Sequence, residues 1–468
     1  MNFRTLRILA PVLAASLLLS GCSTFDFMDS WFTGVSKSKL KGERISVMAT
    51  DESLKADPSL AGVKVTLPRP YVNSEWPNPG GYAANAMYHL EASGHLRKVW
   101  EVDAGQGSTT ESRLTAPPVV GGGRIFVLDA AAKVHAFDAR DGSELWSQSL
   151  APKGGEASFL NTATLGLMGQ NNAIDPTKGF GGGLAYEGGR LFATSGFGTV
   201  VAFAAQNGGR LWKTDLGVPV VNAPVANGGR LFVSSEDNHF VALAQSDGRK
   251  LWDHQGISEA AGILSSTSAA VAGEFVIVPY TSGELYAIRV QNGRPAWNDM
   301  LTRSGQVTAL SELDDIAGRP VVDRDMVFAI SHSGVMAAIS LSTGDRIWSR
   351  DIGGIQTPWA AGDFIFVLTT DSQLMCLQRK DGRVKWIAQM DRWQNPEAKS
   401  GAIVWAGPVL ISNRLIVVSN TGVIASVSPY TGKILGREDF DGGTMIAPVV
   451  ANSTLYVLTK HAQLLALK

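Results

Sequence analysis

Few side chains in this 468-residue chain have the types and spacing that chemistry requires. The seven histidines are scattered singly, and none has the spacing of a metal-ligand set. The motifs G-x-S-x-G, H-E-x-x-H, C-x-x-C and G-x-G-x-x-G and the Walker A loop are all absent. The sequence therefore predicts a protein that is not an enzyme and that holds no metal ion and no organic cofactor.

Asp314 and Asp315, within the run LSELDDIAGRPVV, form the acidic cluster that we weighed as a site. Neighbouring residues on a strand point to opposite faces, so the two carboxylates make a poor general acid/base pair. An acidic pair on a solvated loop is an ordinary feature. The same pair would also suit a contact with a basic patch on a partner protein. The residues alone leave the last two interpretations open.

The overall charge gives no sign of a nucleic-acid partner. Lys and Arg number 41 and Asp and Glu number 42, with both signs interspersed, so the chain has no basic face. Charged residues make up 18% of the chain and hydrophobic residues 45%, which is typical of a compact, weakly charged body. The only cysteine beyond Cys22 is Cys376, so we expect no intramolecular disulfide.

A short phrase recurs along most of the chain. Its clearest copy runs from Asp247 to Trp252 as DGRKLW and follows the alternating run HFVALA. An alternating strand that ends in Asp-Gly, Asn-Gly or Thr-Gly and leads into a second strand is typical of a β-hairpin. The aromatic on the second strand is expected to pack between neighbouring repeats as a structural residue. Seven positions carry this Trp: Trp100, Trp146, Trp212, Trp252, Trp297, Trp348 and Trp386. One copy of the phrase has Gly436 instead of the aromatic.

A second phrase, two apolar runs separated by a turn, occurs eight times between residues 116 and 459. Together with the hairpin phrase it makes four strands per repeat. The eighth repeat stops at Lys468 before its Trp strand, whereas the strand at 95–102 precedes the first repeat without partners. Supplying that strand to the last repeat closes the circle and removes an exposed edge. Residues 94–468 are therefore predicted to form an all-β, eight-bladed β-propeller of four-stranded antiparallel blades, with an insertion at 151–183.

The first 93 residues read differently from the repeats. Residues 1–21 combine a basic start with a short apolar stretch, which is typical of a secretory signal. Leu19-Ser20-Gly21-Cys22 resembles the lipobox of bacterial lipoproteins, which implies cleavage before Cys22 and acyl chains on that residue. Ser23 follows instead of the Asp that retains many such proteins in the inner membrane, so we expect the outer membrane. Residues 22–93 are predicted to be a lipidated tether and an arm that lies on the globular part.

The repeat [DNT]-G-x-x-x-W resembles the repeat of quinoprotein dehydrogenases, in which a Trp fastens each blade. Two families share this repeat. The pyrroloquinoline quinone enzymes also carry adjacent cysteines in a disulfide and a calcium site, and this chain has no Cys-Cys pair. The BamB-type lipoproteins of the outer-membrane β-barrel assembly (BAM) machinery combine a lipobox, a tether and an eight-bladed propeller without a cofactor. From Cys22 to Lys468 the chain resembles this second family.

The resemblance implies a non-enzymatic periplasmic scaffold that binds a BamA-type subunit and assists the insertion of unfolded outer-membrane proteins. In that family two loops in the middle of the propeller face BamA. Here Leu264, in the run GILS, occupies the position of the first loop, and Asp314 and Asp315 occupy the second. Leu264 and Asp315 match the family best. Two alternatives are a periplasmic dehydrogenase dependent on pyrroloquinoline quinone and a binding propeller with another envelope partner.

Overall fold

The computed structural model describes residues 54–152, 181–259, 267–302 and 314–468. The chain divides into two compact units, Met1–Leu54 and Lys55–Lys468. The predicted signal peptide and Cys22 fall outside the described residues, and so does most of the predicted insertion at 151–183. The unit Lys55–Lys468 contains all the strands described below.

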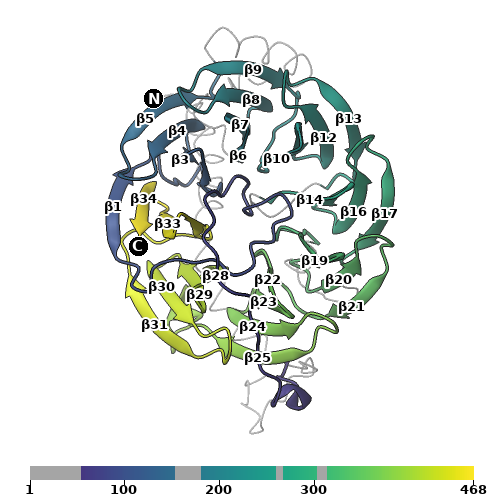
Figure 1. Ribbon diagram of the computed structural model, residues 1–468, viewed down its shortest axis with the longest axis vertical. Helices are drawn as coiled ribbons and strands as arrows, with labels where there is room; N and C mark the ends of the chain where they lie inside the picture. Colours follow the sequence, from purple (N-terminus) through teal and green to yellow (C-terminus); the bar gives the residue numbers. More distant parts are fainter. Residues whose placement is uncertain (1–53, 153–180, 260–266, 303–313) are drawn as a thin grey trace, which may run out of the picture. The chain divides into compact units, whose positions relative to one another are not determined.

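Within the described residues the strands form eight four-stranded antiparallel sheets arranged as the blades of a ring (Figure 1). The predicted all-β, eight-bladed propeller is therefore confirmed. Blade 1 consists of β2 (Val119–Gly121), β3 (Arg124–Leu128), β4 (Lys133–Asp138) and β5 (Glu144–Ser149), and blade 2 of β6 (Gly182–Glu187), β7 (Arg190–Ser195), β8 (Thr199–Ala204) and β9 (Arg210–Asp215). Blade 3 consists of β10 (Val225–Asn227), β11 (Arg230–Ser234), β12 (His239–Ala244) and β13 (Lys250–Gln255), and blade 4 of β14 (Ala270–Ala272), β15 (Phe275–Pro279), β16 (Glu284–Arg289) and β17 (Pro295–Met300).

Blade 5 consists of β18 (Val321–Asp323), β19 (Met326–Ile330), β20 (Met336–Ser340) and β21 (Arg346–Arg350), and blade 6 of β22 (Trp359–Ala361), β23 (Phe364–Leu368), β24 (Gln373–Gln378) and β25 (Val384–Gln389). Blade 7 consists of β28 (Trp405–Ile411), β29 (Arg414–Ser419), β30 (Val423–Val427) and β31 (Ile434–Asp439), and blade 8 of β32 (Val449–Ala451), β33 (Thr454–Leu458), β34 (Gln463–Leu467) and β1 (Lys98–Asp103). The two other described elements are the hairpin β26 (Trp393–Asn395) and β27 (Ser400–Ala402), and the short 3-10 helix η1 (Pro58–Leu60).

Each blade is a meander whose first strand is innermost, since the first strands of neighbouring blades contact one another. The antiparallel order places two kinds of connection on opposite faces of the ring. One face, which we call the loop face, carries the connections between blades and the turns between second and third strands. The other, the turn face, carries the turns between first and second strands and between third and fourth strands. Blade-to-blade loops are therefore all presented on one side.

The ring closes as predicted, by an N-terminal strand. β1 pairs with β34 antiparallel, so the strand that carries Trp100 is the outer strand of blade 8. Arg97 and Lys468 exchange backbone hydrogen bonds of 2.9 and 2.8 Å beside this pairing. The first and last parts of the repeat region are therefore joined in one sheet, which leaves no blade incomplete.

The seven Trp side chains lie at the joints between blades. Within its own blade, six of the seven rings pack near an aromatic of the second strand, as Trp252 does with Phe232 at a centroid separation of 5.9 Å. On the other side it packs against the glycine of the next blade's last turn, since a Cβ added at Gly293 would meet the Trp252 ring at 2.8 Å. The Trp252 Nε1 also donates to the carbonyl of Val290, at 2.9 Å. Trp146, Trp212, Trp297, Trp348 and Trp386 donate in the same way to the next blade.

The joint between blades 7 and 8 explains why Gly436 replaces the aromatic. In blade 8 the third strand ends the chain and the outer strand comes from the N-terminal side, so this blade has no turn between its third and fourth strands. The glycine that receives the Trp in every other joint therefore has no counterpart here. All six residues of β31 are exposed, and a Cβ at Gly436 would meet nothing within 4 Å.

An arm formed by residues 73–90 runs round the inside of the ring at its turn face (Figure 1, purple). It makes hydrogen bonds to the first strand of every blade, in order round the circle: first blade 8, then blades 1 to 6, and finally blade 7. The bonds pair Asn73 with Val450, Trp76 with Val120, Pro77 with Tyr186, Asn78 with Ala226, Ala83 with Val271, Ala84 with Val322, Tyr88 with Trp359 and Leu90 with Leu410. Several arm side chains, including Trp76, Asn78, Met87 and Leu90, are buried.

A cavity of about 180 Å³ lies between the arm and the inner parts of blades 1, 5, 6, 7 and 8. The arm contributes Trp76, Pro79 and Asn85 to the lining of this cavity. Trp76 stacks on Trp359 with ring centroids 6.5 Å apart. Arg319 also lines the cavity, and burial lowers the pKa of its guanidinium to about 10, so it stays charged at neutral pH.

Candidate interaction surface

The predicted partner-binding residues belong to the two connections that enter and leave blade 4. Leu264 lies outside the described residues, in the connection from β13 to β14. Asp314 and Asp315 are described and lie in the connection from β17 to β18. The described ends of both connections lie on the loop face, on either side of blade 4.

The two aspartates lie in a connection and not on a strand, and they differ in exposure. Asp314 is partly exposed and lies beside the turn between β15 and β16, because a Cβ added at Gly283 would meet the Asp314 Cβ at 3.1 Å. Asp315 is only 2% exposed, and its carbonyl accepts a 2.9 Å hydrogen bond from the backbone of His332 in blade 5. Asp314 is therefore the member of the pair that a partner on the loop face can reach.

A polar network supports the loop face of blade 4. His254 Nδ1 lies 2.8 Å from the Tyr280 hydroxyl, and its ring packs 4.6 Å from that of Tyr286. Glu284, which is 4% exposed, accepts hydrogen bonds from the hydroxyls of Ser282 and Tyr286 at 2.8 and 3.3 Å. Burial lowers the pKa of His254 and raises the pKa of Tyr280, so both are neutral at neutral pH. The network holds the turn that separates the two connections.

Sequence reasoning missed Ile257, which lies on the loop face at the start of the connection from β13. Its side chain is 54% exposed although it is a large aliphatic group. The only signal available in the sequence was the Gly256-Ile257 pair at a position where the other repeats, except the one that contains Trp348, have an apolar residue directly after the Trp strand.

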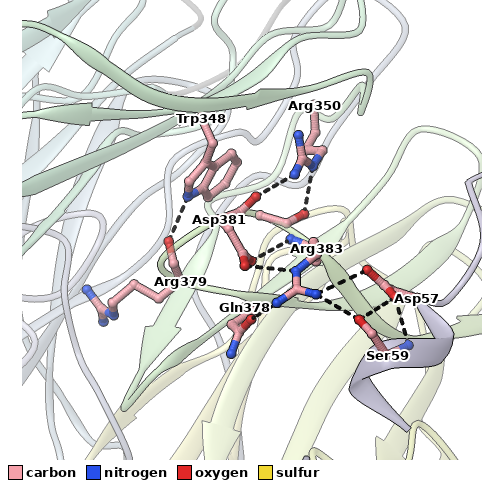
Figure 2. A network of polar contacts seen from close by, with 9 residues as sticks. Asp57, Ser59, Trp348, Arg350, Gln378, Arg379, Asp381 and Arg383 are labelled. Atoms are coloured by element: carbon pink, nitrogen blue, oxygen red, sulfur yellow. Dashed lines mark hydrogen bonds and ion pairs between the residues drawn. The ribbon is translucent and has the colours of Figure 1, made fainter.

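The segment that contains Asp57 and Ser59, ahead of the arm, is fixed on the turn face at blade 6 (Figure 2). Arg383, in the turn between β24 and β25, donates to the Ser59 hydroxyl at 2.7 Å and lies 3.5 Å from the Asp57 carboxylate. The Asp57 N–H donates to the carbonyl of Val384 at 2.8 Å, and hydrogen bonds from Ser59 hold the pKa of Asp57 below its usual value. The chain therefore leaves the propeller toward residue 54 on the face opposite Asp314 and Ile257.

In the described ranges, His, Cys, Asp and Glu residues form no group of three or more that could hold a metal ion. Nor does the described part of the chain contain a helix long and apolar enough to cross a membrane. The single cysteine it contains, Cys376, is buried, and burial raises the pKa of its thiol.

Comparison with known proteins agrees with the fold and identifies the family. The model of the family described as outer membrane protein assembly factor BamB matches residues 84–164 and 163–388. An outer membrane protein assembly factor BamB from Yersinia pestis is 24% identical over 371 residues, covering 79% of this chain and 88% of the relative. The crystal structure of BamB from Moraxella catarrhalis superposes with a TM-score of 0.64 at 16% identity, covering 80% of this chain and 99% of that one.

A quinohemoprotein alcohol dehydrogenase from Comamonas testosteroni also superposes, with a TM-score of 0.61 at 11% identity, covering 84% of this chain and 80% of that one. At that identity the likeness concerns the propeller fold alone. The family model, in contrast, spans more than half of the chain, through blades 1 to 5 and nearly all of blade 6. The chain therefore belongs to the family of the outer membrane protein assembly factor BamB.

Proposed function

We propose that the protein is a non-enzymatic scaffold of the outer-membrane β-barrel assembly machinery, which binds a BamA-type subunit and assists the insertion of outer-membrane proteins. The observation that carries the proposal is the family match over residues 84–388, which include both connections that flank blade 4. A rigid ring that presents its blade-to-blade loops on one face is suited to binding, because little ordering is needed when a partner docks.

The partner is expected to dock on the loop face at blade 4. Leu264 supplies an apolar group and Asp314 a carboxylate, a pairing in which the apolar group contributes affinity and the charge selects a basic partner surface. Asp315, which is buried, contributes to the same site by holding the connection in place through the backbone of His332.

Localisation forms the second part of the proposal. A signal peptide at 1–21 is removed, Cys22 is acylated, and the protein is held at the outer membrane with its propeller in the periplasm. The chain from Cys22 to Leu54 is then a tether about 30 residues long. Unfolded outer-membrane proteins are the clients, which the scaffold helps to deliver to the subunit it binds.

The proposal assigns no catalysis to the propeller. In the quinone enzymes that share the repeat, the ring-stacking group is a disulfide between adjacent cysteines, and this sequence has no such pair. Dye-linked alcohol or glucose oxidation after addition of pyrroloquinoline quinone and Ca²⁺ would overturn the non-enzymatic assignment.

Affinity purification of the lipoprotein from detergent-solubilised envelopes tests the proposed partner. The wild-type protein is expected to recover the BamA-type subunit, and the double variant Leu264→Arg/Asp314→Arg is expected to recover less than about one tenth as much, because both an apolar and a charged contact are lost. The readout is quantitative mass spectrometry of the eluate.

The matched control is Leu435→Arg/Asp439→Arg, which changes an exposed leucine and an exposed aspartate on β31, at the outer edge of blade 7. It should recover the subunit at the wild-type level. A wild-type purification that contains no BamA-type subunit would refute the proposed function and favour another envelope partner.

A further inference from the structure

The turn face and the loop face of the ring differ in charge. On the loop face, the turns between second and third strands contain four acidic residues and one basic residue: Asp129, Glu236, Asp237 and Asp371, against Lys460. At the outer rim of the turn face, the turns between third and fourth strands contain more basic than acidic residues: Arg140, Arg249, Arg294, Arg379, Lys380, Arg383 and Lys433, against Asp141, Asp247, Asp345 and Asp381. The repeated hairpin phrase therefore gives the rim of the turn face an excess of positive charge.

Four of these basic side chains, which we call the rim cations, are not neutralised by the protein. They are Arg249, Arg294, Lys380 and Lys433, which are exposed and form no ion pair within the described ranges. They belong to blades 3, 4, 6 and 7, so the charge is spread round the rim. Cations spread in this way suit an extended anionic surface better than a single anionic ligand.

The turn face also carries the exposed aromatic side chains. Of the Trp, Tyr and Phe residues that the structure describes, only Tyr82, Tyr88 and Tyr430 are exposed, and all three lie on this face. Tyr82 and Tyr88 belong to the arm, next to which Val72 is 52% exposed. Tyrosine combines an apolar ring with a polar tip, and it is enriched at the interface between membrane and water.

The arm holds its two exposed tyrosines in fixed positions. Tyr88 has a left-handed φ of 53°, which is unfavourable for a tyrosine, and its carbonyl accepts a 2.6 Å hydrogen bond from Trp359 Nε1. The Tyr82 N–H lies 3.2 Å from Met87 Sδ. Burial, together with the neighbouring Tyr82 and Tyr88, raises the pKa of Tyr71 to about 12, so the three phenols lie in one cluster. The exposed rings are therefore part of an ordered surface.

The described part of the chain also begins on the turn face. Asp57 and Ser59 contact Arg383 in the rim turn of blade 6 (Figure 2). A tether of about 30 residues from the predicted anchor at Cys22 reaches at most roughly 110 Å when it is fully extended. Such a tether keeps the turn face at a high effective concentration near the membrane, so a contact too weak to bind a free protein is sufficient.

We infer that the turn face docks on the phospholipid surface of the membrane to which the protein is anchored. The rim cations then lie at anionic headgroups, and Tyr82, Tyr88 and Val72 lie at the boundary between headgroups and acyl chains. A bilayer with anionic phospholipid offers both components that this face matches, negative charge and an apolar boundary. The inference rests on the proposed lipid anchor and not on the proposed protein partner. In this orientation the loop face points away from the membrane.

The test measures the orientation of the acylated full-length protein on lipid vesicles. A fluorophore is attached to a cysteine introduced at Ser74 on the arm or at Ser258 on the loop face, both of which are exposed, whereas Cys376 is buried. The vesicles contain a lipid with a nitroxide on its headgroup, which quenches fluorophores at the bilayer surface. When one third of the lipid is phosphatidylglycerol, quenching at position 74 is expected to exceed quenching at position 258 by at least about threefold. Raising the salt from about 0.1 to 1 M should lower this ratio at least twofold, because the Debye length falls from about 10 to 3 Å.

A pair of charge-reversed variants tests the rim cations. Arg249→Glu/Arg294→Glu is expected to lower quenching at position 74 by at least about threefold. The matched control is Arg392→Glu/Lys399→Glu, which changes the net charge equally, at two exposed positions in the connection between blades 6 and 7 on the loop face. It should be quenched like the wild type. All four side chains are exposed, so the thermal midpoint should be unchanged, which separates lost docking from lost folding.

The outcomes separate this inference from the proposed function. A purified protein whose mass shows no acyl chains would overturn the anchor and the docking with it. Equal quenching of the acylated protein at positions 74 and 258 would overturn the docking alone, as would equal losses in the two double variants. Absence of quenching on vesicles, with binding to purified peptidoglycan that Arg249→Glu/Arg294→Glu abolishes, would also overturn it, because the cell wall would then be the occupant. None of these results bears on recovery of the BamA-type subunit.

Discussion

Replacing Trp252 by alanine is expected to lower the free energy of unfolding by about 3–5 kcal/mol, as large aromatic truncations in cores do. The indole is buried, packs on Phe232 and Phe240 in its own blade, and donates to Val290 in the next. Its removal opens a void at a joint where the facing residue is a glycine with no side chain to fill it. Urea denaturation followed by far-ultraviolet circular dichroism measures the change.

Two further variants separate the parts of this effect. Trp252→Phe keeps an aromatic ring but leaves the Val290 carbonyl without its donor, and it should cost about 1–3 kcal/mol. Leu435→Ala removes an exposed side chain and should cost less than about 0.5 kcal/mol. A loss below about 1 kcal/mol for Trp252→Ala would mean that the Trp residues do not fasten the blades.

Trp76→Ala is expected to have an effect of the same size, about 3–5 kcal/mol, although this residue lies outside the repeats. Trp76 is 3% exposed and stacks on Trp359, and its backbone N–H and carbonyl both bond to Val120 in blade 1, at 2.8 Å each. The arm thereby ties blade 1 to the seven other blades through one continuous segment. The same denaturation experiment measures the loss.

Tyr82→Ala is the matched control for the arm, because Tyr82 belongs to the same segment but its side chain is 39% exposed. It should cost less than about 1 kcal/mol. If Trp76→Ala destabilised the protein no more than Tyr82→Ala, the arm would be a passive covering of the turn face and not a second closure of the ring.

The architecture was predictable because each blade is encoded by a short local stretch of sequence, and similar stretches recur along the chain. Each copy of the DGRKLW phrase contains a complete hairpin, so the period, the turn glycine and the Trp define a blade without reference to the rest of the chain. The closure by β1 was also predictable, since a Trp strand without partners at one end matched a repeat without its Trp strand at the other. Both predictions follow from counting the repeats and the Trp strands along the sequence.

The course of the arm could not be predicted, because its partners are spread along the whole chain. Asn78 bonds to Ala226 and Asn85 to Pro320, and nothing in the segment 73–90 has a period that would indicate eight successive contacts. The reason for Gly436 was hidden in the same way. From the sequence, the missing aromatic indicates a weaker joint between two blades. The structure instead relates the missing aromatic to a turn that the closing blade lacks.

Less of the candidate surface was predictable. We expected Asp314 and Asp315 to face opposite ways along a strand, whereas both lie in the connection from β17 to β18, where Asp314 is partly exposed and Asp315 is buried. Which aspartate is exposed, and the outward position of Ile257, depend on tertiary neighbours such as Tyr280 that the pattern does not reveal. That Leu264, Asp314 and Asp315 contact a partner stays a prediction.

The account depends most on the claim that the loop face at blade 4 docks on the BamA-type subunit. The direct measurement is site-specific photo-crosslinking in living cells, with the photoreactive residue at Ser258 on the loop face or at Lys433 on the turn face, both of which are exposed. The account predicts a crosslinked product with the BamA-type subunit from position 258 and none from position 433. A product from position 433 alone, or equal products from both, would contradict it.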